Sequence, residues 1–167
     1  MTEHILIKTL QGLQFLEDLP AEYIERITEV SQMRDYVNGE AIFHEGEPAG
    51  MMYLIVSGVV CLKICDGGQN SKQIVRLHTG ELLGWSALTN NRLYAATAVV
   101  DGPTRVIEID GARVQAYCQE DAKFGYEILR RTIQTLSKRL ILTWTQLAEV
   151  SLPRFAPVAA GAAPEIA

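Results

Sequence analysis

The sequence predicts a mainly β fold with flanking helices: a β-roll or jelly roll followed by one long C-terminal helix. Between residues 31 and 109, short β-branched runs alternate with turn residues. Runs spaced about ten residues apart are typical of a sandwich, barrel or jelly roll and not of a parallel α/β sheet. Beyond residue 120, one stretch carries an unbroken helical repeat of apolar residues. These two observations place the strands in the middle of the chain and the long helix after them.

Composition excludes several classes of protein. The chain has 167 residues, 48% of them hydrophobic, so we expect one domain with a substantial core and no extensive disorder. Its net charge of −5 disfavours binding to nucleic acid or to an anionic membrane. No apolar run approaches the ~18 residues of a membrane-spanning helix, and the N-terminus lacks the features of a secretory signal. Three cysteines form an odd, sparse set that fits a reducing compartment, so we expect a cytoplasmic protein.

Residues 1–30 are expected to form N-terminal helices. Apolar residues recur there at helical intervals, and the Leu19-Pro20 step divides the run in two. Pro20 suits the first position of the second helix, because its φ angle is already helical and its missing N–H is not needed there.

Residues 31–120 are expected to form the β-roll. Asn38-Gly39 and the stretch 66–70 are turn signals between strand-like runs, and Gly58 separates two further runs. The one helical segment expected inside the roll is a brief one near Ser86-Ala87-Leu88. The strands therefore follow one another without the long crossover helices of a parallel sheet.

Residues 121–151 are expected to form a dimerisation helix, with Asp121 as its N-cap, and residues 152–167 a flexible tail. Apolar residues of the helix follow steps of three and four, which is an a/d seam with one polar member. A second apolar face, formed by Ile128, Ile141, Trp144 and Ala148, is expected to pack on the β unit. The seam is expected at a homodimer interface and consists of Tyr126, Leu129, Ile133, Leu136, Leu140, Thr143, Leu147 and Val150.

Several short motifs occur at fixed places in this pattern. They are Leu19-Pro20 before a helix, the runs 39–47 and 52–60, and Gly80-Glu81 followed by Leu83-Gly84. In order and spacing they resemble the cyclic-nucleotide-binding domain family, which includes the catabolite activator protein and the regulatory subunits of protein kinase A. The resemblance covers about Phe15 to Val150. It implies a non-enzymatic sensor of cAMP, cGMP or a similar small anion, which signals allosterically through the long helix.

The resemblance also implies a phosphate-binding cassette over residues 83–97. In the family this segment reads Phe-Gly-Glu-Leu-Ala-Leu, then a spacer and an arginine. Here Gly84 matches the glycine, Trp85 replaces the ribose-binding glutamate, and Tyr94 or Ala95 replaces the phosphate-binding arginine. A cyclic phosphate needs converging N–H groups and usually a guanidinium. The expected ligand-binding residues are Gly84, Trp85, Ser86, Ala87, Arg92, Tyr94, Ala95, Ala96 and Thr143.

Some of these residues have two interpretations. Arg92 could replace the missing arginine from the same strand face, or lie solvated at a loop edge. Trp85 and Tyr94 could stack on a purine, or fill the pocket and leave a ligand-free protein-interaction module. Thr143 falls where the activator protein has a threonine that contacts adenine, but a lone threonine in the seam could also have no role.

Other activities have weak support in the sequence. The histidines His4, His44 and His78 stand in no metal-ligand spacing, so we expect no enzyme, metal or cofactor. A haem sensor using His78 is a second alternative. Only residues 152–167 follow the long helix, too few for a helix-turn-helix, so direct DNA binding is not expected and the protein partner is unknown.

Overall fold

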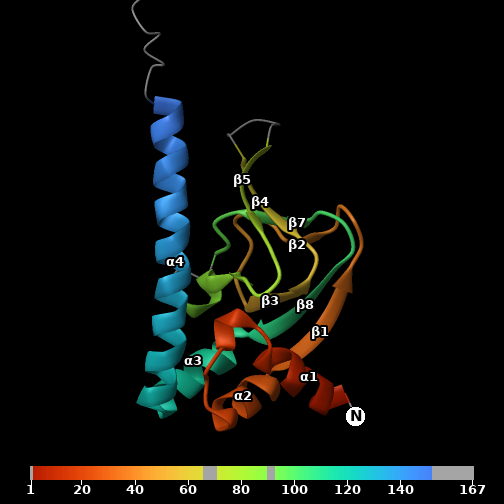
Figure 1. Cartoon of the computed structure of the whole chain (residues 1–167), viewed down its shortest axis with the longest axis vertical. Helices are drawn as coiled ribbons and strands as arrows, with labels where there is room; N and C mark the ends of the chain where they lie inside the picture. Colours follow the sequence, from red (N-terminus) through yellow and green to blue (C-terminus); the bar gives the residue numbers. More distant parts are fainter. Residues whose placement is uncertain (1, 66–70, 90–92, 152–167) are drawn as a thin grey trace, which may run out of the picture.

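A computed structural model describes residues 2–65, 71–89 and 93–151, and confirms the mainly β fold with flanking helices (Figure 1). Three helical segments precede the strands: α1 (Thr2–Gln11), the 3-10 helix η1 (Gln14–Leu16) and α2 (Ala21–Thr28). Pro20 is the N-cap of α2 and not its first helical residue. Two helices follow the strands: α3 (Gly111–Glu120) and the long α4 (Ala122–Ser151).

Eight strands form two antiparallel four-stranded sheets, ordered β1-β8-β3-β6 and β2-β7-β4-β5. A second 3-10 helix, η2 (Trp85–Leu88), lies between β6 and β7, where the sequence predicts a brief helix. The strands are β1 (Ser31–Tyr36), β2 (Ala41–Phe43), β3 (Met51–Ser57), β4 (Val60–Cys65), β5 (Ser71–Leu77), β6 (Leu82–Leu83), β7 (Thr97–Val100) and β8 (Thr104–Asp110).

The core is divided into two apolar clusters by β3. Successive side chains of a strand point to opposite faces. Met52 and Leu54 therefore pack against the helices, whereas Tyr53 and Ile55 point into the roll. This double burial explains why β3 is an almost continuous apolar run instead of an alternating one.

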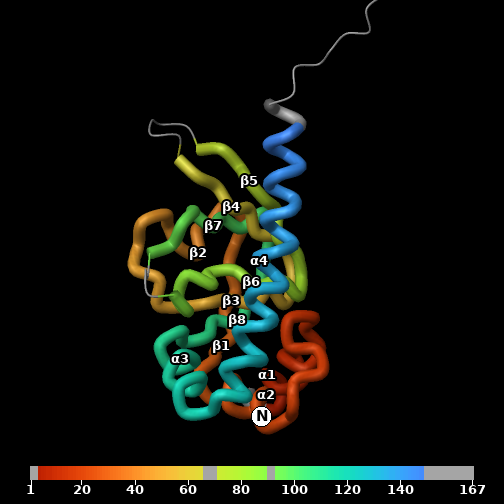
Figure 2. The backbone as a smooth tube through the Cα atoms, turned by 90° about the vertical axis from the view of Figure 1, so that its left-hand side faces the viewer, coloured from red at the N-terminus to blue at the C-terminus, as the bar shows by residue number. Residues whose placement is uncertain are grey.

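The long helix α4 stands upright beside the roll; α3 lies next to its first turns, and α1 lies farther away, below β1 (Figure 1). Asp121 caps its start, because the carboxylate accepts hydrogen bonds from the N–H groups of Lys123 (2.9 Å) and Phe124 (3.1 Å). The view turned by 90° shows the helix running along the face of the roll (Figure 2). No helix in the described ranges is long and apolar enough to cross a membrane.

One expectation for α4 is confirmed for Ile128, which is buried in a cluster that includes Met52 and Leu54, and is wrong for the other residues of that face. Ile141 and Trp144 were expected to pack on the β unit, but their exposed fractions are 59% and 61%. The reason is the rotation of the helix about its axis. Phe124 and Ile128 are buried in the apolar cluster that α4 forms with the N-terminal helices and with Met52 and Leu54, and this packing turns a different face of α4 toward the cavity. That face carries Leu136, Arg139 and Thr143.

Candidate ligand site between the roll and the long helix

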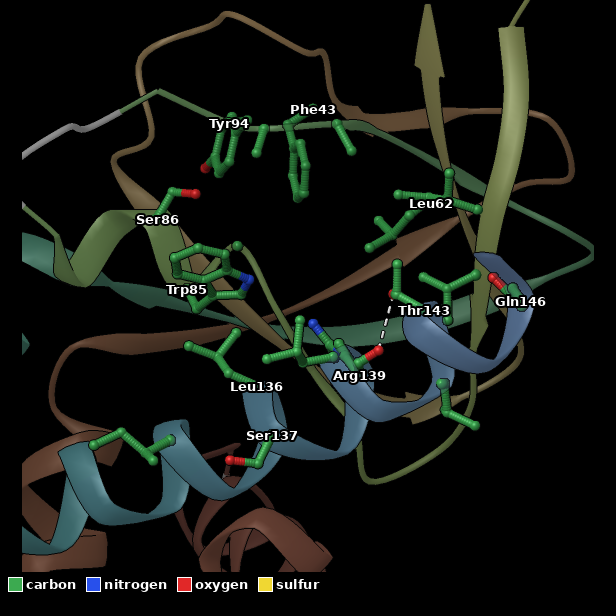
Figure 3. Close-up of a pocket in the computed structure, with 18 residues that line it drawn as sticks. Phe43, Leu62, Trp85, Ser86, Tyr94, Leu136, Ser137, Arg139, Thr143 and Gln146 are labelled. Carbon is green, nitrogen blue, oxygen red and sulfur yellow. Dashed lines mark hydrogen bonds between the residues drawn. The ribbon is translucent and has the colours of Figure 1, made fainter. Parts of the chain in front are cut away.

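A cavity of about 520 Å³ lies between the roll and α4. Side chains of β2, β4, β5, η2 and the segment 94–96 form its walls, and one face of α4 closes the remaining side (Figure 3). Most of the lining side chains are apolar. Among the described residues that line it, Arg139 carries the one charged side chain, and none has a carboxylate. This volume is within the ~300–1,000 Å³ of small-molecule sites.

The structure brings most of the predicted binding residues together. Gly84, Trp85, Ser86, Tyr94, Ala95, Ala96 and Thr143 all line the cavity. Ala87 does not: it is 1% exposed in the cluster inside the roll, because the tight turn of η2 points it away from α4. Arg92 lies outside the described residues.

Gly84 sets the position of η2. It is the N-cap of that helix and has a φ of +72°. A Cβ atom there would lie 2.7 Å from the Met51 carbonyl oxygen and 3.1 Å from the Tyr53 ring, so only glycine fits without strain. Among the described residues, the N–H groups of Trp85 and Ser86 have no backbone acceptor. Both residues stand at the start of η2 and line the cavity.

Tyr94 is firmly held inside the roll. Its ring stacks on Phe43 at a centroid distance of 3.8 Å. Its hydroxyl donates to the Met51 carbonyl oxygen (2.8 Å) and accepts from the Met51 N–H (3.2 Å). Burial, together with hydrogen bonding to Tyr94, raises the pKa of Tyr53 far above its ordinary value. The phenol rings of Tyr53 and Tyr94 thus occupy the part of the roll where the resemblance implies an arginine.

Arg139 is a cavity residue that the sequence interpretation missed. Its Nη2 donates to the carbonyl oxygen of Leu82, while its Nε is buried without a hydrogen-bond partner in the described structure. Burial lowers the pKa of its guanidinium, and the negative charge of Glu81 partly opposes this shift. Its spacing in the sequence could have identified it: Arg139 lies four residues before the predicted binding residue Thr143, and residues four apart share a helix face.

The predicted dimer seam has two kinds of position. Tyr126, Leu129 and Leu147 are 49% to 66% exposed and do not line the cavity. Four seam members line the cavity instead, namely Ile133, Leu136, Leu140 and Thr143. The side chain of Val150 lies outside the described residues. The middle part of the apolar seam therefore borders the cavity, although Ile133 and Leu140 are themselves 61% and 49% exposed.

The described residues contain no group of three or more histidine, cysteine, aspartate or glutamate side chains that could hold a metal. His78, on which the haem alternative depends, is exposed and does not line the main cavity. It lines a second hollow of about 380 Å³, together with Arg131, Lys138 and Arg139.

Comparisons with known proteins agree with the β-roll fold of this chain. A family model described as "Cyclic nucleotide-binding domain" matches residues 33–121. The cAMP-dependent protein kinase regulatory subunit of Dictyostelium discoideum is 30% identical over 109 residues, 64% of this chain and 32% of that protein. A solved cyclic nucleotide-binding domain from Methylobacillus flagellatus superposes with a TM-score of 0.75 at 16% identity, covering 92% of this chain and 86% of that one.

A further structural neighbour is the regulatory subunit of a cAMP-independent protein kinase A from Trypanosoma brucei. It superposes with a TM-score of 0.68 at 20% identity, over 80% of this chain and 47% of that one. At 16% and 20% identity, these two structural similarities establish the fold and nothing about function. The chain spans 21% to 32% of the length of the curated relatives that it matches. The matched family segment ends at residue 121, before the cavity-lining residues of α4.

Proposed function

This chain belongs to the cyclic nucleotide-binding domain family, and from that premise we propose that it is a non-enzymatic regulatory domain that binds cAMP or cGMP between its roll and α4. The observation that carries the proposal is the cavity of about 520 Å³ bordered by η2 and the segment 94–96. It lies where the resemblance implies the nucleotide-binding cassette. Its apolar walls suit a flat purine, and the N–H groups of Trp85 and Ser86 suit an anionic oxygen.

Binding is expected to be weaker than a complete cassette would give. Trp85 offers an aromatic face, and stacking on a base contributes ~1–3 kcal/mol. Two charged contacts are missing, because Trp85 and Tyr94 stand where the resemblance implies a glutamate and an arginine. Since each charge-assisted hydrogen bond contributes ~1.5–3 kcal/mol, the loss of two corresponds to a factor of about 10² to 10⁴ in Kd.

The signal would pass through α4. Thr143 and Leu136 of this helix face Phe43 and Leu62 of the roll across the cavity (Figure 3). A ligand that contacts both walls favours one position of the helix over others, which is the unequal binding that regulation requires. We further propose that the exposed seam of α4 pairs with the same helix of a second copy, as the heptad spacing indicates.

One set of observations favours a second candidate, a ligand-free interaction module. Tyr94 is held by Phe43 and by the backbone of Met51, at the position where the resemblance implies an arginine. The regulatory subunit of a cAMP-independent protein kinase A from Trypanosoma brucei shares this fold, so the fold does not by itself imply regulation by cAMP. In this alternative Trp85 and Tyr94 serve packing only.

Calorimetric and thermal-shift titrations with cAMP and cGMP decide between the two candidates. A ligand at 100 times its Kd stabilises the folded protein by about 2.7 kcal/mol, which is a readily measured shift in Tm. Ala95→Trp places a large ring at an exposed position of the cavity wall and should abolish the shift. Val37→Trp is the matched control, because Val37 is 67% exposed and does not line the cavity. Absence of any shift at millimolar cAMP and cGMP would reject the proposal and favour the interaction module.

A further inference from the structure

Arg139 differs from the other arginines in how its charge is compensated. Elsewhere in the described chain, arginine side chains have a carboxylate oxygen within 4 Å: these are Arg26, Arg34, Arg76, Arg105, Arg130 and Arg131. Arg113 instead lies over the ring of Tyr117. Arg139 has a neutral backbone carbonyl, that of Leu82, as its acceptor, and its Nε is buried with no partner among the described residues. It is therefore a largely buried cation without an ion pair.

A buried charge without a counter-ion is unfavourable, because the protein interior does not replace the water that the charge has lost. The lowered pKa of Arg139 has this cause, and Glu81 offsets it only in part. The guanidinium carries a planar set of N–H donors that matches the oxygens of a phosphate or carboxylate. An anion that enters the cavity therefore meets an unsatisfied donor set and a positive charge.

We infer that Arg139 recognises the anionic group of the ligand, so that charge recognition comes from α4 and not from the roll. This inference rests on the proposed function, and it names the ligand class as a flat apolar body that carries one anionic group. The apolar body would lie against roll residues such as Phe43 and Leu62, and the anion would pair with Arg139. The ligand then joins the roll to the helix, and its departure leaves the guanidinium unpaired. Binding and the position of α4 are coupled through this one charge.

Three variants of the full chain test the inference. Arg139→Gln removes the charge but keeps a hydrogen-bond donor for the Leu82 carbonyl, and Arg139→Lys keeps the charge. Lys138→Gln is the matched control, because Lys138 is exposed, adjacent in sequence and lines the second hollow but not the main cavity. Calorimetry measures Kd for cAMP and for adenosine, which lacks the phosphate.

For Arg139→Gln we expect about ten- to a hundredfold weaker cAMP binding, the range for a charge-assisted hydrogen bond, with adenosine affinity unchanged. Arg139→Lys should recover part of the loss, and Lys138→Gln should bind cAMP as the wild type does. Equal cAMP affinity in Arg139→Gln and wild type would overturn the inference and leave the proposed function intact. An equal loss in Lys138→Gln would also overturn it, because the anion would then lie in the second hollow.

A wild-type protein that binds neither cAMP nor cGMP would reject the proposed function, and the inference then has its own test. Phenyl phosphate is an apolar ring with one phosphate group, and thermal shifts at constant ionic strength report its binding. A rise in Tm for wild type that is absent in Arg139→Gln supports the role of Arg139. Identical shifts in both proteins, or none in either, would overturn it.

Discussion

The two halves of α4 contact the rest of the molecule in different ways. In the first half, Phe124 and Ile128 are 0% and 1% exposed and belong to the cluster formed with the N-terminal helices. In the second half, Trp144 and Leu147 are each 61% exposed, and Arg139 and Thr143 border the cavity. A fully buried apolar side chain contributes about 1.5–3 kcal/mol, so core packing fixes the first half firmly. The second half depends on fewer contacts, and a ligand in the cavity acts on that part of the helix.

The strongest test of this division is Phe124→Ala. The ring packs edge-on against Tyr23 and Tyr117, with centroids 5.2 and 6.1 Å away. Removing it should lower the free energy of unfolding by about 3–5 kcal/mol, because apolar contacts are lost and a cavity remains. Trp144→Ala, an aromatic truncation on the exposed half, should change it by less than about 0.5 kcal/mol. Urea unfolding followed by circular dichroism measures both, and equal losses would contradict the division.

A smaller effect, confined to assembly, is expected from Leu147→Glu. If the exposed half of α4 pairs with a second copy, a buried carboxylate there should weaken self-association at least about tenfold, or ~1.4 kcal/mol. Ile5→Glu on α1 is the control, since Ile5 is 55% exposed and lies on a different helix. Sedimentation equilibrium measures the association constant. A wild-type protein that stays monomeric at all concentrations would show that the seam has no role in pairing.

The smallest effect is expected from Asp121→Asn at the start of α4. Hydrogen bonds from the N–H groups of Phe124 and Lys123 hold the pKa of Asp121 below its ordinary value of 3.8. Because the pKa is lower in the folded state, the ionised carboxylate stabilises the fold at pH values above the unfolded-state pKa. This stabilisation is lost as the pH falls through the folded-state pKa. Wild type should therefore lose slightly more stability than Asp121→Asn between about pH 5 and about pH 2. If the free energy of unfolding changes with pH by the same slope in wild type and in Asp121→Asn, the proposed stabilisation by the Asp121 N-cap is contradicted.

Local patterns in the sequence were sufficient for the fold class and for much of the site. Turn signals such as Asn38-Gly39 and the apolar run of β3 identify the strands without reference to distant contacts. Gly84 marks the start of η2, because its φ of +72° is a local need of that turn; its close approach to Met51 is a contact with another strand. The predicted cassette residues that line the cavity come from two segments, residues 84–86 and 94–96.

Two residues show where sequence patterns were insufficient. Ala87 has the small side chain expected beside a ligand, but the 3-10 geometry of η2 turns it into the core of the roll. Arg139 resembles any exposed helix arginine in the sequence, and its unpaired state depends on the burial that the Leu82 segment and α4 produce together. Neither outcome follows from the spacing of neighbours along the chain.

The sequence by itself determined the run of strands, the turn glycine of η2 and the apolar repeat of α4, because each depends on interactions within a few residues. It did not separate α3 from the expected β-roll of residues 31–120. The tertiary structure decided which face of α4 meets the roll. That choice is a rotation of the whole helix, set by the burial of Phe124 and Ile128 at its first turns. The same rotation places Arg139 and Thr143 at the cavity and leaves Ile141 and Trp144 exposed.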